Sequence, residues 1–301
     1  MDLKRQSRVQ IPETPLTEPY MITVDRTICS RCGTCVERFR GYCVTSKDGY
    51  PEFDPELCNL CRKCASLCPS RAIFVNGIRP SRIEGPHGVT PDNLAEFLRR
   101  RRSIKIFDNK AIPRPLVSRI AESANWAPNQ NKNIAALIID DPAIISEIDL
   151  KAMDFVKKMD RLLFSFKPLT FLFGLFAKRL DVIKKKMDYD LKVTGHVVKK
   201  NAAAVIILTG DPRVPVTSES APFLLANMIL TAESLGIGSC LMDSLKHTLN
   251  TGRKLRQKLR LSGRVLGVLL LGYPAEKILN VPDGYAVDVR WNADQESVRR
   301  G

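Results

Sequence analysis

Long hydrophobic runs are missing from this chain of 301 residues. The longest, Ala202–Leu208 and Val265–Leu271, fall well short of the roughly 18 residues that a membrane-spanning helix needs. The first residues lead into no apolar segment of a secretory signal, so we expect a cytoplasmic protein. The chain also has no Gly-x-Gly-x-x-Gly motif, which leaves a Rossmann nicotinamide domain without support.

Histidine is scarce, and cysteine is nearly absent from most of the chain. The three histidines, His87, His196 and His247, are interpreted as surface or linker residues, with His196 the best placed of them to act as an acid. Beyond Cys68 the sequence has a single cysteine, Cys240, which we interpret as a small buried hydrophobic residue.

The charge balance is strongly basic, at a formal +15, while the apolar fraction of 44% is ordinary for a globular protein. The basic excess is greatest in residues 151–200. Such an excess suits nucleic acid, an anionic membrane or an acidic partner. Among these, we regard nucleic acid as an unlikely partner, and membrane contact is not favoured.

The composition changes along the chain in four steps. Residues 1–20 contain three prolines and read as an extended tail. Residues 21–80 hold eight of the cysteines and are too few for a large hydrophobic core. We therefore expect bound inorganic groups to stabilise this region. Residues 81–91 have a linker composition, and residues 92–301 show an α+β pattern with enough length for one sizeable core.

The pattern in the last of these regions also predicts individual elements. We expect Asp92 to cap a helix over Leu94–Arg102, and residues 143–200 to be mostly helical. Further helices are expected over Pro115–Trp126 and Ala221–Leu235. The expected strands are Ala135–Ile139, Ala202–Thr209, Ile237–Met242 and Val265–Gly272.

Eight of the nine cysteines lie between Cys29 and Cys68. In a reducing compartment such a group is more typical of metal sites than of disulfides. The second half reads Cys-x2-Cys-x2-Cys-x3-Cys-Pro, the bacterial signature of a [4Fe–4S] cluster. The first half has the same two gaps, but seven residues precede its fourth cysteine and Val44 follows it. Two zinc sites with four cysteine ligands each are the alternative, although zinc ribbons use separated Cys-x2-Cys pairs.

This block, over residues 21–80, resembles a bacterial ferredoxin with two clusters. In such proteins the fourth cysteine of each run serves the other cluster. The resemblance therefore implies two [4Fe–4S] clusters, each held by four thiolates. One set is Cys29, Cys32, Cys35 and Cys68, and the other is Cys58, Cys61, Cys64 and Cys43.

Four features follow one another in residues 92–301. A basic cluster ends in Arg101-Arg102-Ser103-Ile104-Lys105-Ile106-Phe107, and an amide-rich loop covers residues 127–133. A glycine turn at residues 235–243 and a strand that stops at Gly272-Tyr273-Pro274 complete the set. This ordered set resembles the FMN-dependent nitroreductase family, whose first motif reads roughly Arg-Arg/His-Ser-x-Arg/Lys-x-Phe. The resemblance implies an α+β sandwich with a central mixed sheet.

The same resemblance implies a set of flavin contacts but no catalytic residue. Arg101 and Ser103 would hold the flavin phosphate, with Arg102 and Lys105 close by. The chemistry suits this, because a guanidinium fork and a hydroxyl both match a doubly charged phosphate. The amide loop departs from the family pattern, since Asn129 replaces a serine and the usual Gln-Pro-Trp is missing. The other implied contacts are Asn129, Asn131, Leu241, Met242, Asp243 and Arg290.

Residues 162–179 are rich in phenylalanine and leucine, and three consecutive lysines follow at 184–186. An interfacial membrane helix is one interpretation, and ordinary core is another. We favour a substrate lid with dimer packing, since nitroreductases place a lid between their second and third conserved blocks. The lid is expected to be helical over about residues 150–198.

Two redox modules on one chain predict a path for electrons. Iron–sulfur clusters pass single electrons, whereas FMN accepts them singly and releases a hydride equivalent. We expect a low-potential donor, reduced ferredoxin or NAD(P)H, to supply a homodimer that reduces a nitroaromatic, a quinone or an activated alkene. The alternatives are an electron-transfer or redox-sensing flavoprotein that acts on a protein partner and, less favoured, a nucleic-acid-binding protein with a structural cluster.

Overall fold

The structure is a computed structural model that describes residues 22–39, 42–58, 61–86, 88–127, 134–164, 180–214 and 217–282. By its contacts the chain divides into two compact units, Met1–Pro86 with Arg102–Glu276, and His87–Arg101 with Lys277–Gly301. In the first unit we call residues 22–86 the cysteine-rich region and residues 102–276 the α/β core. The predicted tail, residues 1–20, lies outside the described residues.

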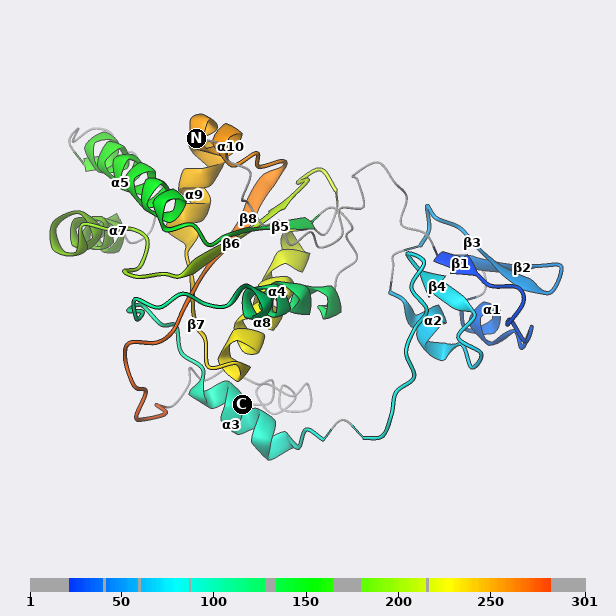
Figure 1. The fold of residues 1–301 in the computed structure, drawn as a ribbon. Coiled ribbons are helices and arrows are strands. Elements are labelled where there is room, and N and C mark those ends of the chain that lie inside the picture. The colour runs from blue at the N-terminus through cyan, green and yellow to red at the C-terminus, as the bar shows by residue number, and fades with distance from the viewer. Residues whose placement is uncertain are drawn as a thin grey trace, which may run out of the picture. The chain divides into compact units, whose positions relative to one another are not determined.

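Two small antiparallel sheets and two short helices make up the cysteine-rich region (Figure 1). Asp48 and Gly49 both have positive φ, which is the conformation of a tight two-residue hairpin turn. The buried cluster here contains Cys64, Ala65 and Ile73. The elements are β1 (Ile22–Val24) paired with β4 (Ile73–Val75), β2 (Val44–Lys47) paired with β3 (Tyr50–Phe53), α1 (Thr34–Phe39) and α2 (Lys63–Leu67).

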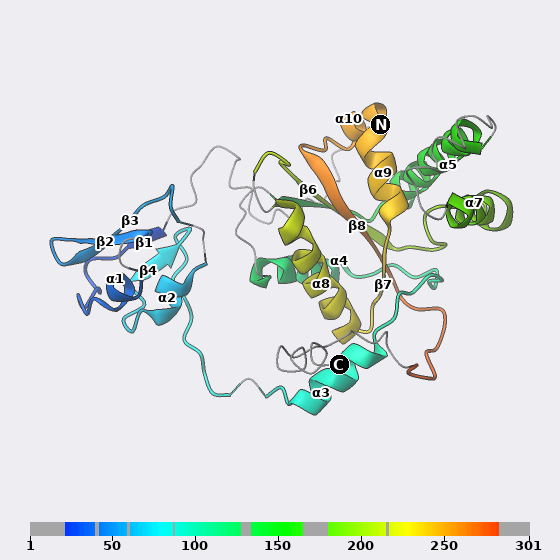
Figure 2. The same cartoon turned by 180° about the vertical axis from the view of Figure 1, so that it is seen from behind.

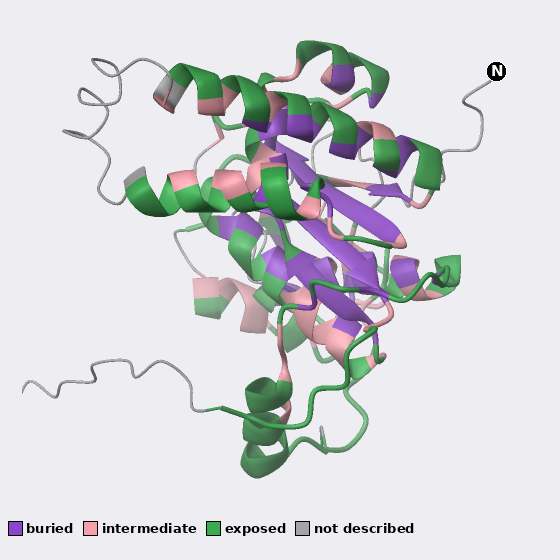
Figure 3. Ribbon diagram, turned by 90° about the vertical axis from the view of Figure 1, so that its left-hand side faces the viewer, coloured by how far each residue is buried: buried purple, intermediate pink, exposed green. Residues whose placement is uncertain are grey.

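A four-stranded sheet in the order β5-β6-β8-β7 lies at the centre of the α/β core. Its strands are β5 (Ile134–Ile139), β6 (Ala204–Gly210), β7 (Gly238–Leu241) and β8 (Arg264–Gly272). Every ladder in it is antiparallel, and a parallel contact occurs as an isolated bridge between Ser103 and Ser239. β6 and β8 are almost fully buried, which explains why they read as continuous apolar runs (Figure 3).

Helices cover both faces of this sheet, and side chains that alternate along each strand fill the two resulting cores. On β6, Val205 and Ile207 pack toward one layer, whereas Ile206 and Leu208 pack toward the other. Figures 1 and 2 show the two layers from opposite sides. One layer has α5 (Pro142–Phe164), α7 (Leu180–Asp188), the π-helix η2 (Tyr189–Thr194), α9 (Asp243–Thr251) and α10 (Arg253–Lys258); the other has α4 (Arg114–Glu122), the 3-10 helix η1 (Ser123–Trp126) and α8 (Thr217–Ser234).

The α+β fold class is confirmed, with small shifts at the predicted boundaries. The predicted cap at Asp92 is wrong: α3 (Pro91–Arg100) begins after Thr90, whose hydroxyl accepts the Asn93 N–H at 3.2 Å. Pro91 then occupies the first helical position, where its missing N–H costs nothing. α8 begins four residues before the predicted Ala221 and has Pro222 within it. Within the described ranges, no helix is both long and apolar enough to span a membrane.

Candidate functional site

The eight clustered cysteines fall into two groups, and each group lines its own cavity. The first cavity, of about 210 Å³, is lined by Cys29, Cys32, Cys35 and Cys68. The second is only about 10 Å³ and is lined by Cys43, Cys58, Cys61 and Cys64. The grouping is the one that the ferredoxin resemblance implies. In the described part of the chain, no three His, Cys, Asp or Glu side chains converge as they would around a single metal ion.

A repeated turn positions the first cysteine of each group. The carbonyl oxygens of Asp25 and Asp54 accept the N–H groups of Cys29 and Cys58, at 3.1 and 3.0 Å. Each aspartate carboxylate also accepts a backbone N–H two residues on, which is the Asx-turn geometry. The Asp-x3-Cys spacing that precedes each cysteine run was a signal in the sequence that we missed.

Backbone conformation also repeats, at the residue after the second cysteine of each run. Gly33 has a φ of +74° and Arg62 has a φ of +58°, and each directly precedes the residue that begins a short helix. This left-handed residue turns the chain so that the third cysteine, Cys35 or Cys64, lies on the helix that follows. An arginine in this conformation is strained relative to glycine, so the turn at Arg62 is imposed by its surroundings.

Burial and the neighbouring cysteines of the same group both raise the pKa of the buried thiols. Burial raises the pKa of Cys64 to about 12, and the neighbouring Cys58, Cys61 and Cys43 contribute to this rise. Burial likewise raises the pKa of Cys35, to which Cys68 and Cys32 contribute. Thiols in this state remain protonated at neutral pH unless a cation compensates the thiolate. The donor set therefore fits an iron–sulfur cluster, whose iron ions provide that compensation.

The basic segment 102–107 is held against the edge of the central sheet by its two buried residues. Ile104 and Phe107 are 4% and 1% exposed, and the Ile104 N–H donates to the Ser239 carbonyl at 3.0 Å. A Cβ on Gly238 would lie 2.8 Å from Ile104, and one on Gly272 would lie 2.6 Å from Phe107. Glycine at both positions therefore allows the segment to approach the sheet closely.

Ser103 and Lys105 are exposed, on either side of the buried Ile104. Ser103 forms its isolated bridge with Ser239 of β7, so this part of the segment lies at the β7 edge. Arg102 is half-buried, and Arg101, which follows α3 in the second unit, is also half-buried. An exposed hydroxyl and an exposed cation on an anchored segment fit a phosphate group.

β7 presents Leu241 at its outer edge. The Met242 N–H donates to the Val268 carbonyl at 2.9 Å, so it points toward β8. Because backbone groups alternate along a strand, Leu241 turns its N–H to the opposite edge, where Ser239 receives the Ile104 N–H. Asp243 follows as the exposed first residue of α9. Of the other implied flavin contacts, Asn129, Asn131 and Arg290 lie outside the described residues.

Sequence reasoning missed the partner of His196. The His196 Nδ1 lies 2.5 Å from Asp149 Oδ2, while Asp149 Oδ1 accepts the N–H groups of Val197 and Val198 at 2.7 Å each. Asp149 is 8% exposed and lies four residues after Ile145, on the buried face of α5. Asp149 falls within the apolar repeat of this helix. A carboxylate at such a position indicates a buried charged group, and this was the signal in the sequence. Cys240, in contrast, is buried in the core as predicted.

The segment predicted as a helical lid, about residues 150–198, is helical in its described part up to Thr194, and residues 195–198 are not helical. α5 and α7 lie side by side, and the Lys184 ammonium bridges them by an ion pair with Asp160 at 2.8 Å (Figure 3). Leu162 and Val182 are 54% and 43% exposed, so this pair of helices carries apolar surface. Residues 165–179, which hold most of the phenylalanines of the segment, lie outside the described residues.

Comparisons by sequence match the two parts of the chain to different families. The model of the nitroreductase family matches residues 98–273, more than half of the chain. A model described as a 4Fe-4S binding domain matches residues 50–73. An uncharacterized ferredoxin of Methanocaldococcus jannaschii is 35% identical over 65 residues, which are 20% of this chain and 84% of that protein.

Solved structures of nitroreductases match about two thirds of this chain. A nitroreductase with bound FMN from Bacteroides fragilis matches with a TM-score of 0.51 and 19% identity, over 66% of this chain and 97% of its own. A nitroreductase with bound FMN from Desulfitobacterium hafniense has a TM-score of 0.49 and 16% identity, over 64% and 97% of the two chains. We base the fold assignment on the first of these.

Proposed function

Because the chain belongs to the nitroreductase family and carries a 4Fe–4S ferredoxin-like region, we propose that it passes electrons from a low-potential donor through two [4Fe–4S] clusters to FMN. The acceptor is a small organic molecule such as a nitroaromatic, a quinone or an activated alkene. The observation that carries this proposal is the separation of eight cysteines into two groups of four on a chain whose other part has a flavoprotein fold.

Two sets of thiolates would hold the clusters, which supply one-electron transfer when bound. Cys29, Cys32, Cys35 and Cys68 line one cavity, and Cys43, Cys58, Cys61 and Cys64 line the other. Two Asx turns and two left-handed residues fix the backbone around both sites.

Of the residues that would hold FMN, Ser103 and Leu241 lie at the β7 edge of the sheet. Ser103 and Lys105 bind the phosphate together with Arg101, Arg102 and Arg290, because hydroxyl, ammonium and guanidinium groups all match its charge. The Leu241 N–H at the β7 edge donates to the flavin ring, and Met242 and Asp243 continue that wall. Asn129 and Asn131 add amide contacts at the ring edge. FMN, when bound, supplies an acceptor that takes electrons singly or as a hydride.

We also propose that the protein is a cytoplasmic homodimer in which α8 contributes to the interface. α8 packs Leu224, Leu225 and Met228 against the sheet but leaves Phe223 52% exposed. Trp126, on the neighbouring η1, is 75% exposed, and the Asn227 amide joins the two helices through the Ser123 carbonyl. Large aromatic side chains in such positions are typical of buried interface cores. A monomer in light scattering that still binds FMN tightly would contradict this part.

An anaerobic purification tests the cofactors. We expect close to eight iron atoms and one FMN per chain, since two four-iron clusters and one flavin are proposed. Stoichiometric zinc without iron would contradict the cluster assignment. Cys240→Ala, a change outside both groups of cysteines, should keep the full iron content.

The electron path needs a separate test. Cys58→Ser should damage one cluster and leave FMN bound, because residues 102–107 and β7 are separate from the cysteine-rich region in sequence. Turnover with dithionite should then continue, while turnover from a reduced ferredoxin should fall to background. A variant that retains FMN, lacks the cluster and still accepts electrons from ferredoxin at the parent rate would make the cluster structural or sensory. A protein partner instead of a small acceptor would appear as reduction without turnover of any screened compound.

A further inference from the structure

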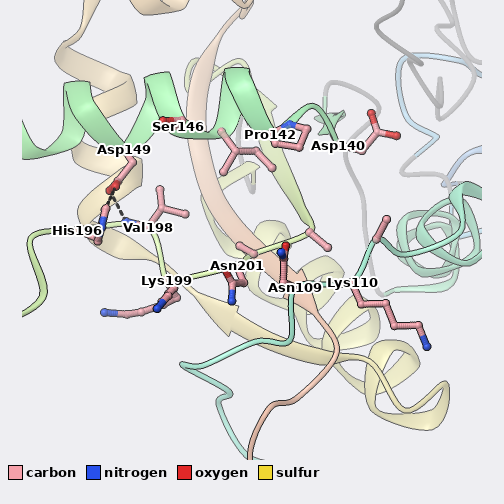
Figure 4. Close-up of a pocket in the computed structure, with 15 residues that line it drawn as sticks. Asn109, Lys110, Asp140, Pro142, Ser146, Asp149, His196, Val198, Lys199 and Asn201 are labelled. Carbon is pink, nitrogen blue, oxygen red and sulfur yellow. Dashed lines mark hydrogen bonds and ion pairs between the residues drawn. The ribbon is translucent and has the colours of Figure 1, made fainter.

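A third cavity, of about 490 Å³, is lined by none of the clustered cysteines and by no residue of β7 (Figure 4). One wall is the first half of α5, from Pro142 to Asp149, and the other is the segment 198–203, which turns at Asn201 before it leads into β6. Asn109 and Lys110 close one end, and His196 closes the other. This volume is in the range of pockets that bind small organic molecules.

The acidic groups of this cavity are already engaged by hydrogen bonds. Asp149 accepts from His196 and from two backbone N–H groups, so both of its oxygens are used. Asp140 accepts a two-pronged interaction from Arg114, with Nε and Nη2 at 2.5 and 3.1 Å from its two oxygens. Both carboxylates are therefore oriented by these partners and not by the lysines that line the cavity.

The basic groups are placed differently. Lys199 is half-buried and Lys200 is exposed, and both line the same wall. Lys110 lies 4.3 Å above the ring of Tyr273, which holds it at the far end. His196 is held by Asp149 through Nδ1, so its Nε2 is the nitrogen left to face a ligand. Between these ends, Ile145 and Val198 provide an apolar surface.

We infer that this cavity binds a small organic anion, with an apolar body against Ile145 and Val198 and a phosphate or carboxylate against Lys199 and Lys200. Three lysines, Lys110, Lys199 and Lys200, line the cavity against two carboxylates, and an anionic head group compensates this excess of positive charge. The site is distinct from the flavin residues, so ligand and FMN bind together.

Calorimetric titration of the FMN-saturated protein tests this inference. The probes are butyl phosphate, pentanoate and inorganic phosphate. We expect one molecule to bind per chain without release of FMN, and butyl phosphate to bind at least tenfold more tightly than inorganic phosphate, which has no apolar body. Comparison of butyl phosphate with pentanoate identifies the preferred head group. Displacement of FMN, no binding of either organic probe, or equal affinity for butyl and inorganic phosphate would overturn the inference.

A matched pair of variants separates this site from the general positive charge of the protein. Lys199→Ala/Lys200→Ala removes two lysines of the cavity, and Lys157→Ala/Lys158→Ala removes two adjacent exposed lysines of α5 that do not line it. The first pair should weaken binding by about 10- to 150-fold, the equivalent of one lost charge-assisted hydrogen bond. The second should change it less than twofold. Equal losses in both would mean that diffuse charge, not a site, attracts the anion.

Discussion

The α/β core buries large apolar side chains, whereas the cysteine-rich region buries mostly small residues and thiols. Phe107, Ile148, Ile206 and Leu269 are all under 2% exposed in the core. In the cysteine-rich region, the buried cluster consists of Cys64, Ala65 and Ile73. Burial of an Ile or Phe side chain contributes about 1.5–3 kcal/mol, so the core has the larger hydrophobic contribution by far. We therefore expect the core to be stable as polypeptide and the cysteine-rich region to depend on bound inorganic groups.

The largest effect should follow the removal of iron. Anaerobic chelation should unfold residues 22–75, because small metal-binding domains fold around their metal. Hydrogen exchange measured by mass spectrometry should then show complete loss of protection in β1–β4, with β6 and β8 unchanged. Protection of β1–β4 in the iron-free protein would show that the small apolar cluster is sufficient, and the comparison would fail.

Ile148→Ala should destabilise the α/β core and leave the cysteine-rich region unchanged. Ile148 is fully buried on α5, and loss of such a side chain costs about 2–5 kcal/mol. The thermal midpoint of the core should fall by roughly 4–20 °C at about 2–4 °C per kcal/mol, with the iron content unchanged. Leu150→Ala, on the same helix but 64% exposed, is the control and should be nearly neutral. A parallel loss of iron in Ile148→Ala would mean that the two parts are coupled.

Arg101→Ala should lower FMN affinity without changing the clusters. A lost charge-assisted hydrogen bond costs about 1.5–3 kcal/mol, or roughly 10- to 150-fold in the dissociation constant. Arg99→Ala, two residues earlier on α3, is the control and should retain FMN. Fluorescence titration of the flavin-free protein measures both. Equal affinities in the two variants would refute the phosphate assignment.

Gly238→Ala tests whether the basic segment depends on close contact with the sheet. The new Cβ would lie 2.8 Å from Ile104, and overpacking of this kind costs about 1–3 kcal/mol. We expect a lower thermal midpoint together with weaker FMN binding, since Ser103 and Lys105 would move with Ile104. Gly267→Ala meets the flexible end of Leu225 instead, so it should destabilise less and keep FMN. Full FMN content in Gly238→Ala would argue against the site.

The smallest effect concerns a buried acid in the core. Burial raises the pKa of Asp190 above its usual 3.8, although Lys199 and Lys186 partly oppose this. A raised pKa in the folded state means that stability falls as pH rises from the unfolded pKa through the folded one. Asp190→Asn should therefore raise the thermal midpoint at pH 7 by about 1–2 °C and leave it unchanged near pH 4. A lower midpoint at pH 7 would show that the lysine contacts outweigh the cost of burial.

Sequence reasoning succeeded where the pattern is local. The four strands of the central sheet were predicted to within two residues. β5, β6 and β8 are mostly apolar runs, and β7 follows a glycine turn. The grouping of the cysteines followed from the ferredoxin resemblance, which a short stretch of sequence carries. The cap of α3 was missed because Thr90 and Asp92 are both good capping residues, and Pro91 at the first helical position favours Thr90.

Long-range pairing could not be predicted from the same patterns. Asp149 and His196 are separated by 47 positions and meet because α5 and the segment before β6 pack together. The contact between Ile104 and Ser239 depends on which strand lies at the sheet edge, which no local pattern specifies. The direction of the backbone N–H groups on β7 could not be predicted from the sequence either. The register of β7 on β8 decides that Leu241, and not Met242, turns its N–H outward.

The anchoring of residues 102–108 has a consequence for synthesis on the ribosome. Ile104 and Asp108 pair with Ser239 and Tyr273, which are translated well over a hundred residues later. At about 5–20 residues per second, this segment waits on the order of ten seconds or more for its partners. The cysteine-rich region has all of its strands by Val75 and can acquire iron during that interval. Iron delivery can therefore precede completion of the flavin site on every nascent chain.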